Sequence, residues 1–338
     1  MQKHYKNVKL LKTLDATGFL MGDIIVTDGK ISYVGESISM QCDEEYDLQG
    51  KIVMPSFKNL SCDLRGLSSS EAEKVIMSNI ASGVTEIIAI TDDLILCKYL
   101  FNKLSLTWKV AYPYSEALPN EEDLDKVLLF ADPVVDEENV LDEISDFSAK
   151  NGCQVFVDLF GNLRETGELN SSTGQLPINY IENFGLLDRG GYLSGAICSD
   201  KEDYRLLGEY NFKVVTRPVS DLRKGNGFAN IVQIQNAGLD LAFGSGDDKE
   251  VDFFQIGRSV LLGTRGLLCD GEVLDEREVL SVMSRTEALE EGQDADFIVV
   301  DNTFETIEDV VNHASKRDIE MTIAKGKIIY NREVKDAN

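Results

Sequence analysis

The stretch that decides the fold is Lys51-Ile-Val-Met-Pro-Ser-Phe-Lys-Asn-Leu-Ser-Cys-Asp63. Its short apolar run, residues 52–57, predicts a buried strand, because it is too short for a helix and polar residues follow it. Pro55 near the middle predicts an irregular or poorly paired position, since proline has no backbone N–H. Ser61 and Asp63 follow at spacing i, i+2, which in an extended chain puts both side chains on one face.

The bulk composition limits the class of protein. The chain has 338 residues, 43% of them hydrophobic, which suits one large domain with a buried core plus a small one. Its 33 basic and 59 acidic residues give a formal charge of −26, so nucleic acid and anionic membranes are poor partners. Every apolar run is shorter than a membrane-spanning helix requires.

The cysteines and histidines indicate the compartment and limit the chemistry. Six cysteines are scattered singly, and the N-terminus has no signal-peptide organisation, so we expect reduced thiols in a cytoplasmic protein. The two histidines, His4 and His313, lie near opposite ends, which nearly excludes a catalytic base or metal cluster built on histidine. Cys62 and Cys198 therefore lack a base partner, and we expect buried core cysteines rather than nucleophiles.

The two chain ends have a similar strand pattern. Asp28-Gly29 lies between two alternating runs and predicts a hairpin, and Lys325-Gly326 lies between two more. Neither end has enough strands to bury a core alone. We therefore expect residues 1–50 and 291–338 to form one small β-sandwich domain, with residues 51–290 as a separate domain.

The middle of the chain alternates strands with helices. The predicted strands are residues 52–57, 84–90, 108–112, 127–131, 153–159, 192–197, 212–216 and 239–243. Ser68-Ser-Ser-Glu71 is a capping box that predicts the start of the first helix. Eight strands separated by helices or long connections predict an α/β fold of the TIM (β/α)8 barrel type, whose active sites lie at the C-terminal strand ends.

The opening stretch resembles the first barrel strand of the amidohydrolase superfamily, in its deaminase and chlorohydrolase branch. That branch acts on aminated heterocycles such as S-adenosylhomocysteine, guanine and triazines. Gly50, Met54-Pro55, Phe57 and Asn59 match its pattern, and the best-matching block is residues 177–248. The resemblance implies the same barrel, a metal ion at its mouth and hydrolysis of C–N bonds other than peptide bonds.

The resemblance also identifies positions where this chain departs from the family. The family's metal-ligand positions correspond to Ser61, Asp63, Asp158, Ser194 and Gly246, with Asp247 one place late. The catalytic glutamate corresponds to Gly161. A metal-bound hydroxide needs neutral imidazoles on zinc or iron, and a carboxylic group must move protons. We therefore expect no metal cofactor and no catalysis, with the fold kept for ligand binding, for self-association as a homo-oligomer, or for association with a related protein.

Two alternatives remain from the same residues. Asp63, Asp158 and Asp247 would supply carboxylates for Mg²⁺ or Ca²⁺, in an active hydrolase with a site free of histidine. Arg217 and Arg223 near the mouth would instead hold an anionic group of a small ligand.

Overall fold

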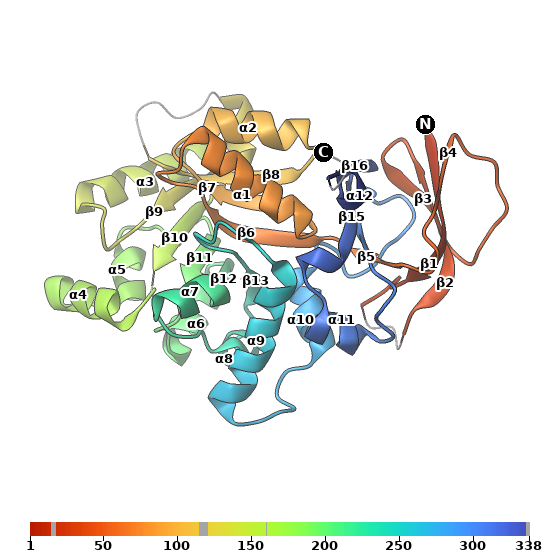
Figure 1. Ribbon diagram of the computed structural model, residues 1–338. Coiled ribbons are helices and arrows are strands. Elements are labelled where there is room, and N and C mark those ends of the chain that lie inside the picture. The colour runs from red at the N-terminus through yellow and green to blue at the C-terminus, as the bar shows by residue number, and fades with distance from the viewer. Residues whose placement is uncertain (15–17, 115–120, 160, 336–338) are drawn as a thin grey trace.

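The computed structural model describes residues 1–338 except 15–17, 115–120, 160 and 336–338, and it contains two sheets (Figure 1). The larger sheet has eight strands, each parallel to its neighbours. They are β6 (Phe57–Asp63), β7 (Val84–Ile90), β8 (Thr107–Pro113), β9 (Val127–Ala131), β10 (Val155–Leu159), β11 (Gly191–Gly195), β12 (Phe212–Thr216) and β13 (Asp240–Phe243). The sheet is a nearly closed barrel, so the predicted TIM barrel is confirmed.

Hydrogen bonds just beyond β13 bring the first and last strands together. Asp63 N donates to Gly246 O, and Gly246 N donates to Ser61 O, both at 2.8 Å. Within β6, the buried Asn59 donates from Nδ2 to Ser245 Oγ at 2.8 Å, and its Oδ1 accepts from Ser245 N at 3.1 Å. The Asn59 side-chain amide thus supplies a hydrogen-bond acceptor for the Ser245 backbone N–H, where the regular hydrogen bonding between β13 and β6 is interrupted.

Helices cover the outside of the barrel. They are α1 (Ser69–Ala81), α2 (Leu94–Lys103), α3 (Glu138–Asn151), α4 (Leu163–Thr173), α5 (Pro177–Asn183), α6 (Lys201–Glu209), α7 (Pro218–Lys224), α8 (Ile231–Asn236), α9 (Phe253–Leu268) and α10 (Glu276–Met283). The Ser68–Glu71 capping box begins α1 as predicted. A bilayer-spanning helix is absent from the described residues, because none combines the necessary length and hydropathy.

Strand alternation divides the barrel into an inner and an outer core. One set of alternating side chains packs inside the barrel, and the other packs outward against the helices. The inner set consists of Leu60, Ile88, Ile90, Ala111, Leu128, Phe130, Phe156, Val215 and Ala242. The inward-facing residues that follow this inner set along each strand lie nearer the C-terminal strand ends, and they can therefore line the mouth of the barrel.

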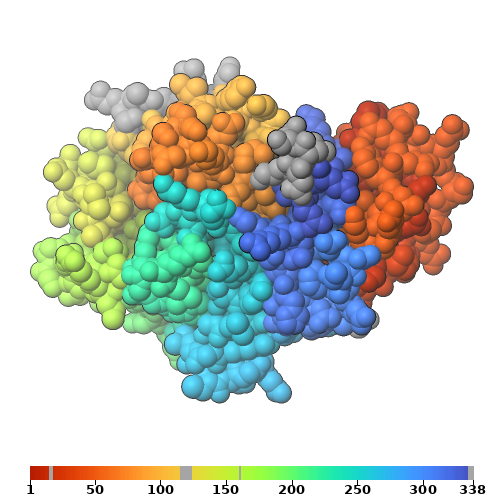
Figure 2. Space-filling model, viewed as in Figure 1, coloured from red at the N-terminus to blue at the C-terminus, as the bar shows by residue number. Residues whose placement is uncertain are grey.

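Both chain ends contribute to the second sheet, which stands beside the barrel (Figures 1 and 2). Its order is β16 (Lys327–Asn331), β15 (Ile319–Ala324), β14 (Phe297–Val300), β5 (Ile52–Pro55), β1 (Gln2–Leu10), β2 (Leu20–Thr27) and β3 (Lys30–Gly35), with β4 (Glu44–Asp47) on β1. Asp28 and Gly29 both have positive φ in the tight turn between β2 and β3, as the hairpin signal predicts. Two short helices, α11 (Ile307–His313) and α12 (Arg332–Lys335), complete the C-terminal segment.

The predicted single strand over residues 52–57 is instead two strands in different sheets. Ile52–Pro55 pairs with β14 and β1 in the small sheet, and the barrel strand starts at Phe57. Val53 packs in the core of the small sheet, whereas Ile52 and Met54 pack in the core that the barrel shares with its helices. Because both faces of β5 are buried, the hydrophobic pattern has no alternation that could separate it from β6.

Candidate functional site at the barrel mouth

A cavity of about 210 Å³ lies at the C-terminal ends of the barrel strands. Segments that follow β6, β9, β10, β12 and β13 contribute to its walls. The lining residues are Asp63, Arg65, Asp132, Val134, Val135, Asp158, Gly161, Glu165, Arg217, Ser220, Lys224, Asn226, Gly246 and Asp247. The predicted strand-end residues Asp63, Asp158, Gly246 and Asp247 are thus brought together, as is Arg217.

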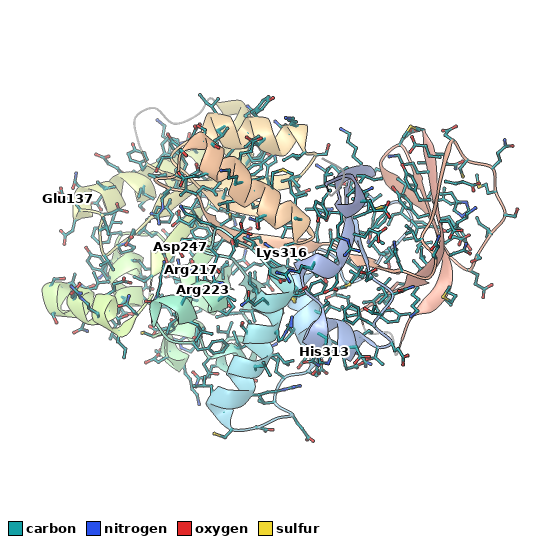
Figure 3. All side chains as sticks on the ribbon, in the orientation of Figure 1. Glu137, Arg217, Arg223, Asp247, His313 and Lys316 are labelled. Carbon is teal, nitrogen blue, oxygen red and sulfur yellow. The ribbon has the colours of Figure 1, made fainter. Side chains whose placement is uncertain are left out.

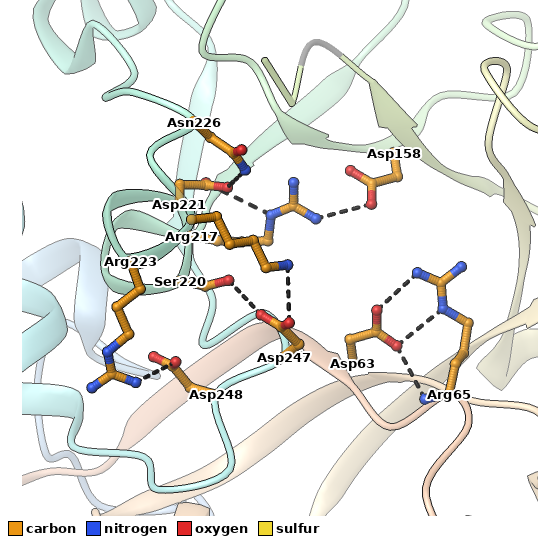
Figure 4. A network of polar contacts seen from close by, with 11 residues as sticks. Asp63, Arg65, Asp158, Arg217, Ser220, Asp221, Arg223, Asn226, Asp247 and Asp248 are labelled. Carbon is orange, nitrogen blue, oxygen red and sulfur yellow. Dashed lines mark hydrogen bonds and ion pairs between the residues drawn. The ribbon is translucent and has the colours of Figure 1, made fainter. Parts of the chain in front are cut away.

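Asp63 is held by an arginine two residues along the chain. Arg65 donates from Nη2 to Asp63 Oδ2 at 2.8 Å and from Nε to Asp63 Oδ1 at 3.0 Å (Figure 4). The Arg65 guanidinium also lies over the Phe130 ring, 4.4 Å from its centroid. This bidentate pair and the stacking fix both side chains at the rim, because a planar guanidinium matches a carboxylate fork and an aromatic face.

Asp158 is held by Arg217, which follows β12. The Arg217 Nη1 group donates to Asp158 Oδ2 at 2.9 Å, and Nε lies 3.8 Å from Asp221 Oδ2 (Figure 4). Burial disfavours the charge on Arg217, but Asp158 and Asp221 outweigh that effect and raise its pKa above the ordinary value. Arg217 is therefore a permanent positive charge, only 12% exposed, in the cavity wall.

Asp247 and Asp248 have separate partners on α7. Asp247 accepts from Ser220 Oγ at 2.6 Å and lies 2.9 Å from Lys224 Nζ. Burial acts to raise the pKa of Asp247, but these two donors lower it below the ordinary value. Asp248 pairs with Arg223 (Figure 4). Arg223, which sequence reasoning grouped with Arg217 as an anion contact, is absent from the cavity lining.

Asp132 lines the cavity and was missed by sequence reasoning, although it directly follows β9. Burial, with repulsion from Asp158 and Asp136, raises its pKa to about 6. Val134 N donates to its Oδ1 at 3.2 Å. A systematic search of every strand end would have found it, since it follows the predicted strand 127–131 without a gap.

Two predicted serine positions are absent from the cavity lining. Ser61 and Ser194 are fully buried, and among the described residues their hydroxyl oxygens have no hydrogen-bond partner. Ser194 is the register partner of Asp158 on the neighbouring strand and shares the inward side of β11 with Tyr192. Cys62 is also buried, and burial raises the pKa of its thiol to about 12, as expected for a core cysteine.

The residues at the mouth do not fit a zinc or iron ion. His4 pairs with Asp23 at 3.0 Å in the small sheet, and His313 is in α11, away from Arg217, Arg223 and Asp247 (Figure 3). Within the described part of the chain, no three His, Cys, Asp or Glu side chains are grouped so that they could hold a metal ion. Asp63, Asp158 and Asp247 are each paired with a cationic side chain of the same protein.

Comparison with known proteins identifies relatives that are named deaminases. No model of a protein family matches the chain. The chain is 26% identical to the 5-methylthioadenosine/S-adenosylhomocysteine deaminase of Bacillus cytotoxicus over 218 residues, 58% of this chain and 50% of the relative. Against the enzyme of the same name from Bacillus cereus it is 25% identical over 248 residues, 67% of this chain and 57% of the relative. The matched part of the chain thus spans little more than half the length of these curated relatives.

Solved structures share the fold at lower identity. A zinc-bound adenosine deaminase from Xanthomonas campestris has a TM-score of 0.82 and 14% identity, with 97% of this chain and 92% of that chain covered. A zinc complex of atrazine chlorohydrolase from Arthrobacter aurescens has a TM-score of 0.80 and 16% identity, with 98% and 96% covered. The predicted resemblance of this chain to the deaminase and chlorohydrolase branch of the amidohydrolase superfamily is therefore confirmed.

Proposed function

We propose that this protein retains the barrel of the metal-dependent deaminases without their metal-hydroxide chemistry. In this proposal the mouth binds a ligand, and the fold supports association with a second copy or with a related, active protein. Its relatives are named for the deamination of 5-methylthioadenosine and S-adenosylhomocysteine. In this proposal the chain does not deaminate these compounds through a metal-bound hydroxide.

One observation supports the proposal: cations of the chain itself pair with the three carboxylates at or next to the positions that correspond to the family's metal ligands. Arg65, Arg217 and Lys224 pair with Asp63, Asp158 and Asp247, respectively. A divalent ion would have to displace these cations and then remain beside them. Like charges a few Å apart repel strongly where water is partly excluded, so Arg65, Arg217 and Lys224 oppose a metal ion at these positions.

The test is metal analysis combined with activity. Protein purified without chelators should contain zinc, iron and manganese far below one equivalent, and added zinc should not produce ammonia from 5-methylthioadenosine or S-adenosylhomocysteine. Arg217→Met serves as a matched variant, because it removes the positive charge beside Asp158 without adding a ligand. A stoichiometric transition metal in the unmodified protein, together with metal-dependent deamination, would overturn the proposal.

A second candidate function rests on Asp132. A carboxyl group with a pKa of about 6 in a cavity suits general acid–base catalysis near neutral pH, so the mouth would hydrolyse a C–N bond without histidine. The residues for this reaction would be Asp132 with Asp63 and Asp158. Metal-independent hydrolysis that is lost in Asp132→Asn and retained after exhaustive chelation would favour this candidate.

A further inference from the structure

Arg217 lines a second, much smaller cavity in addition to the mouth. This cavity has a volume of about 10 Å³, and its polar side chains are those of Thr216, Arg217 and Asp221. Phe228 and Ile231, from the segment that joins α7 to α8, contribute apolar walls. A space of this size holds one water molecule and nothing larger.

The polar groups around the small cavity are buried and lack direct partners. Thr216 is only 3% exposed, and neither its Oγ1 nor Arg217 Nε has a hydrogen-bond partner among the described residues. Asp221, also 3% exposed, accepts from Asn226 Nδ2 with Oδ1 at 3.0 Å, and its Oδ2 lies 3.8 Å from Arg217 Nε (Figure 4). The second separation is too long for a direct hydrogen bond and is typical of groups that a water bridges.

From these observations we propose that the small cavity binds one water molecule, held by Thr216 Oγ1, Arg217 Nε and Asp221 Oδ2. The water accepts from the Arg217 N–H and donates to the Asp221 carboxylate. The Thr216 hydroxyl supplies the third hydrogen bond, and about three is the usual number for a buried water. A cation in this place is opposed by the guanidinium of Arg217, and an anion by the carboxylate of Asp221.

The water makes Thr216 a positioning residue for Arg217. Asp158 holds Nη1 of Arg217 at 2.9 Å at the mouth, and the water holds Nε at the small cavity. The guanidinium is thus fixed at two of its nitrogens, and buried polar groups are satisfied at both. This inference goes beyond the proposed function, because the water site does not depend on what the mouth binds.

High-resolution crystal structures of the full chain and of two Thr216 variants test the site. We expect one ordered water within hydrogen-bond distance of the three groups in the unmodified protein and in Thr216→Ser, which keeps the hydroxyl. Thr216→Val keeps the shape without the hydroxyl, and the water should leave or shift.

Nuclear magnetic resonance of the arginine Nε–H groups tests the positioning role. The Arg217 Nε–H should exchange slowly with solvent in the unmodified protein and about fivefold faster in Thr216→Val, as expected for the loss of one ordinary hydrogen bond. Thr216→Ser should restore slow exchange. Thr264→Val is the matched control, because the Thr264 hydroxyl is also buried and has no partner within the described part of the chain, yet Thr264 does not line the small cavity.

Three outcomes would overturn the inference. These are a crystal structure of the unmodified protein without a water in the small cavity, a water that stays in place in Thr216→Val, or equal Arg217 Nε–H exchange in Thr216→Val and Thr264→Val. If Thr216→Val does not fold, the unmodified protein and Thr216→Ser still decide whether the water is bound. None of these measurements uses metal content or deamination, so their failure leaves the proposed function standing. A zinc-loaded deaminase would refute the proposed function and leave the water site intact.

Discussion

Arg217, which follows β12, pairs with Asp158 at the end of β10, with Nη1 and Oδ2 2.9 Å apart, so the contact spans the intervening strand β11. The residue of β11 in register with Asp158 is Ser194, whose buried hydroxyl has no hydrogen-bond partner in the described part of the structure. The contact thus joins two strands that do not pair with each other. It also places a guanidinium beside two positions where the resemblance puts metal ligands.

The first prediction concerns the contribution of this ion pair to stability. Arg217→Met leaves Asp158 and Asp221 without their cation in a mostly buried setting, so we expect the free energy of unfolding to fall by about 3 kcal/mol. Arg164→Met, which removes an exposed pair with Glu168, should cost far less, because exposed ion pairs add little stability. Urea denaturation at pH 7.5 measures both. Equal losses in the two variants would contradict a special role for Arg217.

The second prediction concerns Asp132 and pH. Its pKa of about 6 in the folded protein exceeds the ordinary value of 3.8, so folding favours the protonated form. The fold therefore loses stability as pH rises from about 4 to 6, and the full cost is present above that range. Asp132→Asn cannot ionise, yet it keeps an acceptor for the Val134 N–H. We expect it to be more stable than the unmodified protein at pH 7.5, by roughly 1–2 kcal/mol after allowance for solvent screening.

Urea denaturation at pH 4 and pH 7.5 separates this effect from a general change in packing. The stability difference should disappear near pH 4, where the native carboxyl is protonated. Asp142→Asn, at an exposed position on α3, is the control and should show no pH-dependent difference. A variant that is less stable at pH 7.5, or a gain that persists at pH 4, would show that ionisation of Asp132 is not the cause.

Much of the barrel was predictable because its strands are local apolar runs with clear stops. The Ser68–Glu71 capping box begins α1, and Gly152, in the left-handed conformation, ends α3. The division between β5 and β6 was not predictable, because both faces of β5 are buried and only its partners reveal the sheet to which it belongs.

Part of the candidate site was predictable from residues at strand ends. The spacing of Ser61 and Asp63 identified Asp63, and the family resemblance identified Asp158. Arg217 was also placed near the mouth, but its pairing with Asp158 was not predicted, because 59 residues separate the two and only the fold brings them together. Glu165 lies on a helix after β10, where an acidic residue is ordinary in a first turn. Its place in the cavity lining becomes visible only once the surrounding side chains are placed.

The third prediction concerns the junction between the two sheets. Arg285 pairs with Asp296, which precedes β14, and it also reaches Glu86 Oε2 on β7 at 3.3 Å and Thr107 Oγ1 on β8 at 3.0 Å. One guanidinium, 15% exposed, thus connects the small sheet to the barrel. Arg285→Met should lower the free energy of unfolding by about 3 kcal/mol, because it leaves Asp296 buried without its cation.

Limited proteolysis reports whether that loss is local to the junction. Arg285→Met should be cleaved faster than the unmodified protein near Ser56, where the chain passes between the sheets, because local opening there becomes easier. Arg277→Met, which removes a more exposed pair with Glu308, is the control. Cleavage that accelerates equally at all sites in both variants would indicate general destabilisation and would contradict a junction role.

The last prediction concerns rebuilding a metal site. Ser61→His, Asp63→His, Asp158→His and Ser194→His place imidazoles at the positions where the resemblance puts ligands, and zinc prefers such donors. Adding Gly246→Asp is unfavourable, because Gly246 has φ +60° and a Cβ there would lie 2.8 Å from Ser220 Oγ.

The four-histidine variant should still bind zinc poorly, since Arg217 loses Asp158 as its partner and its charge then faces the ion. Adding Arg217→Met should strengthen zinc binding by about tenfold or more, measured by competition with a chromogenic chelator. Adding Arg223→Met to the same four-histidine background should have little effect, because Arg223 pairs with Asp248 outside the cavity lining. Equal zinc affinity with and without Arg217 would contradict the expectation that the charge of this arginine opposes a metal ion at the mouth.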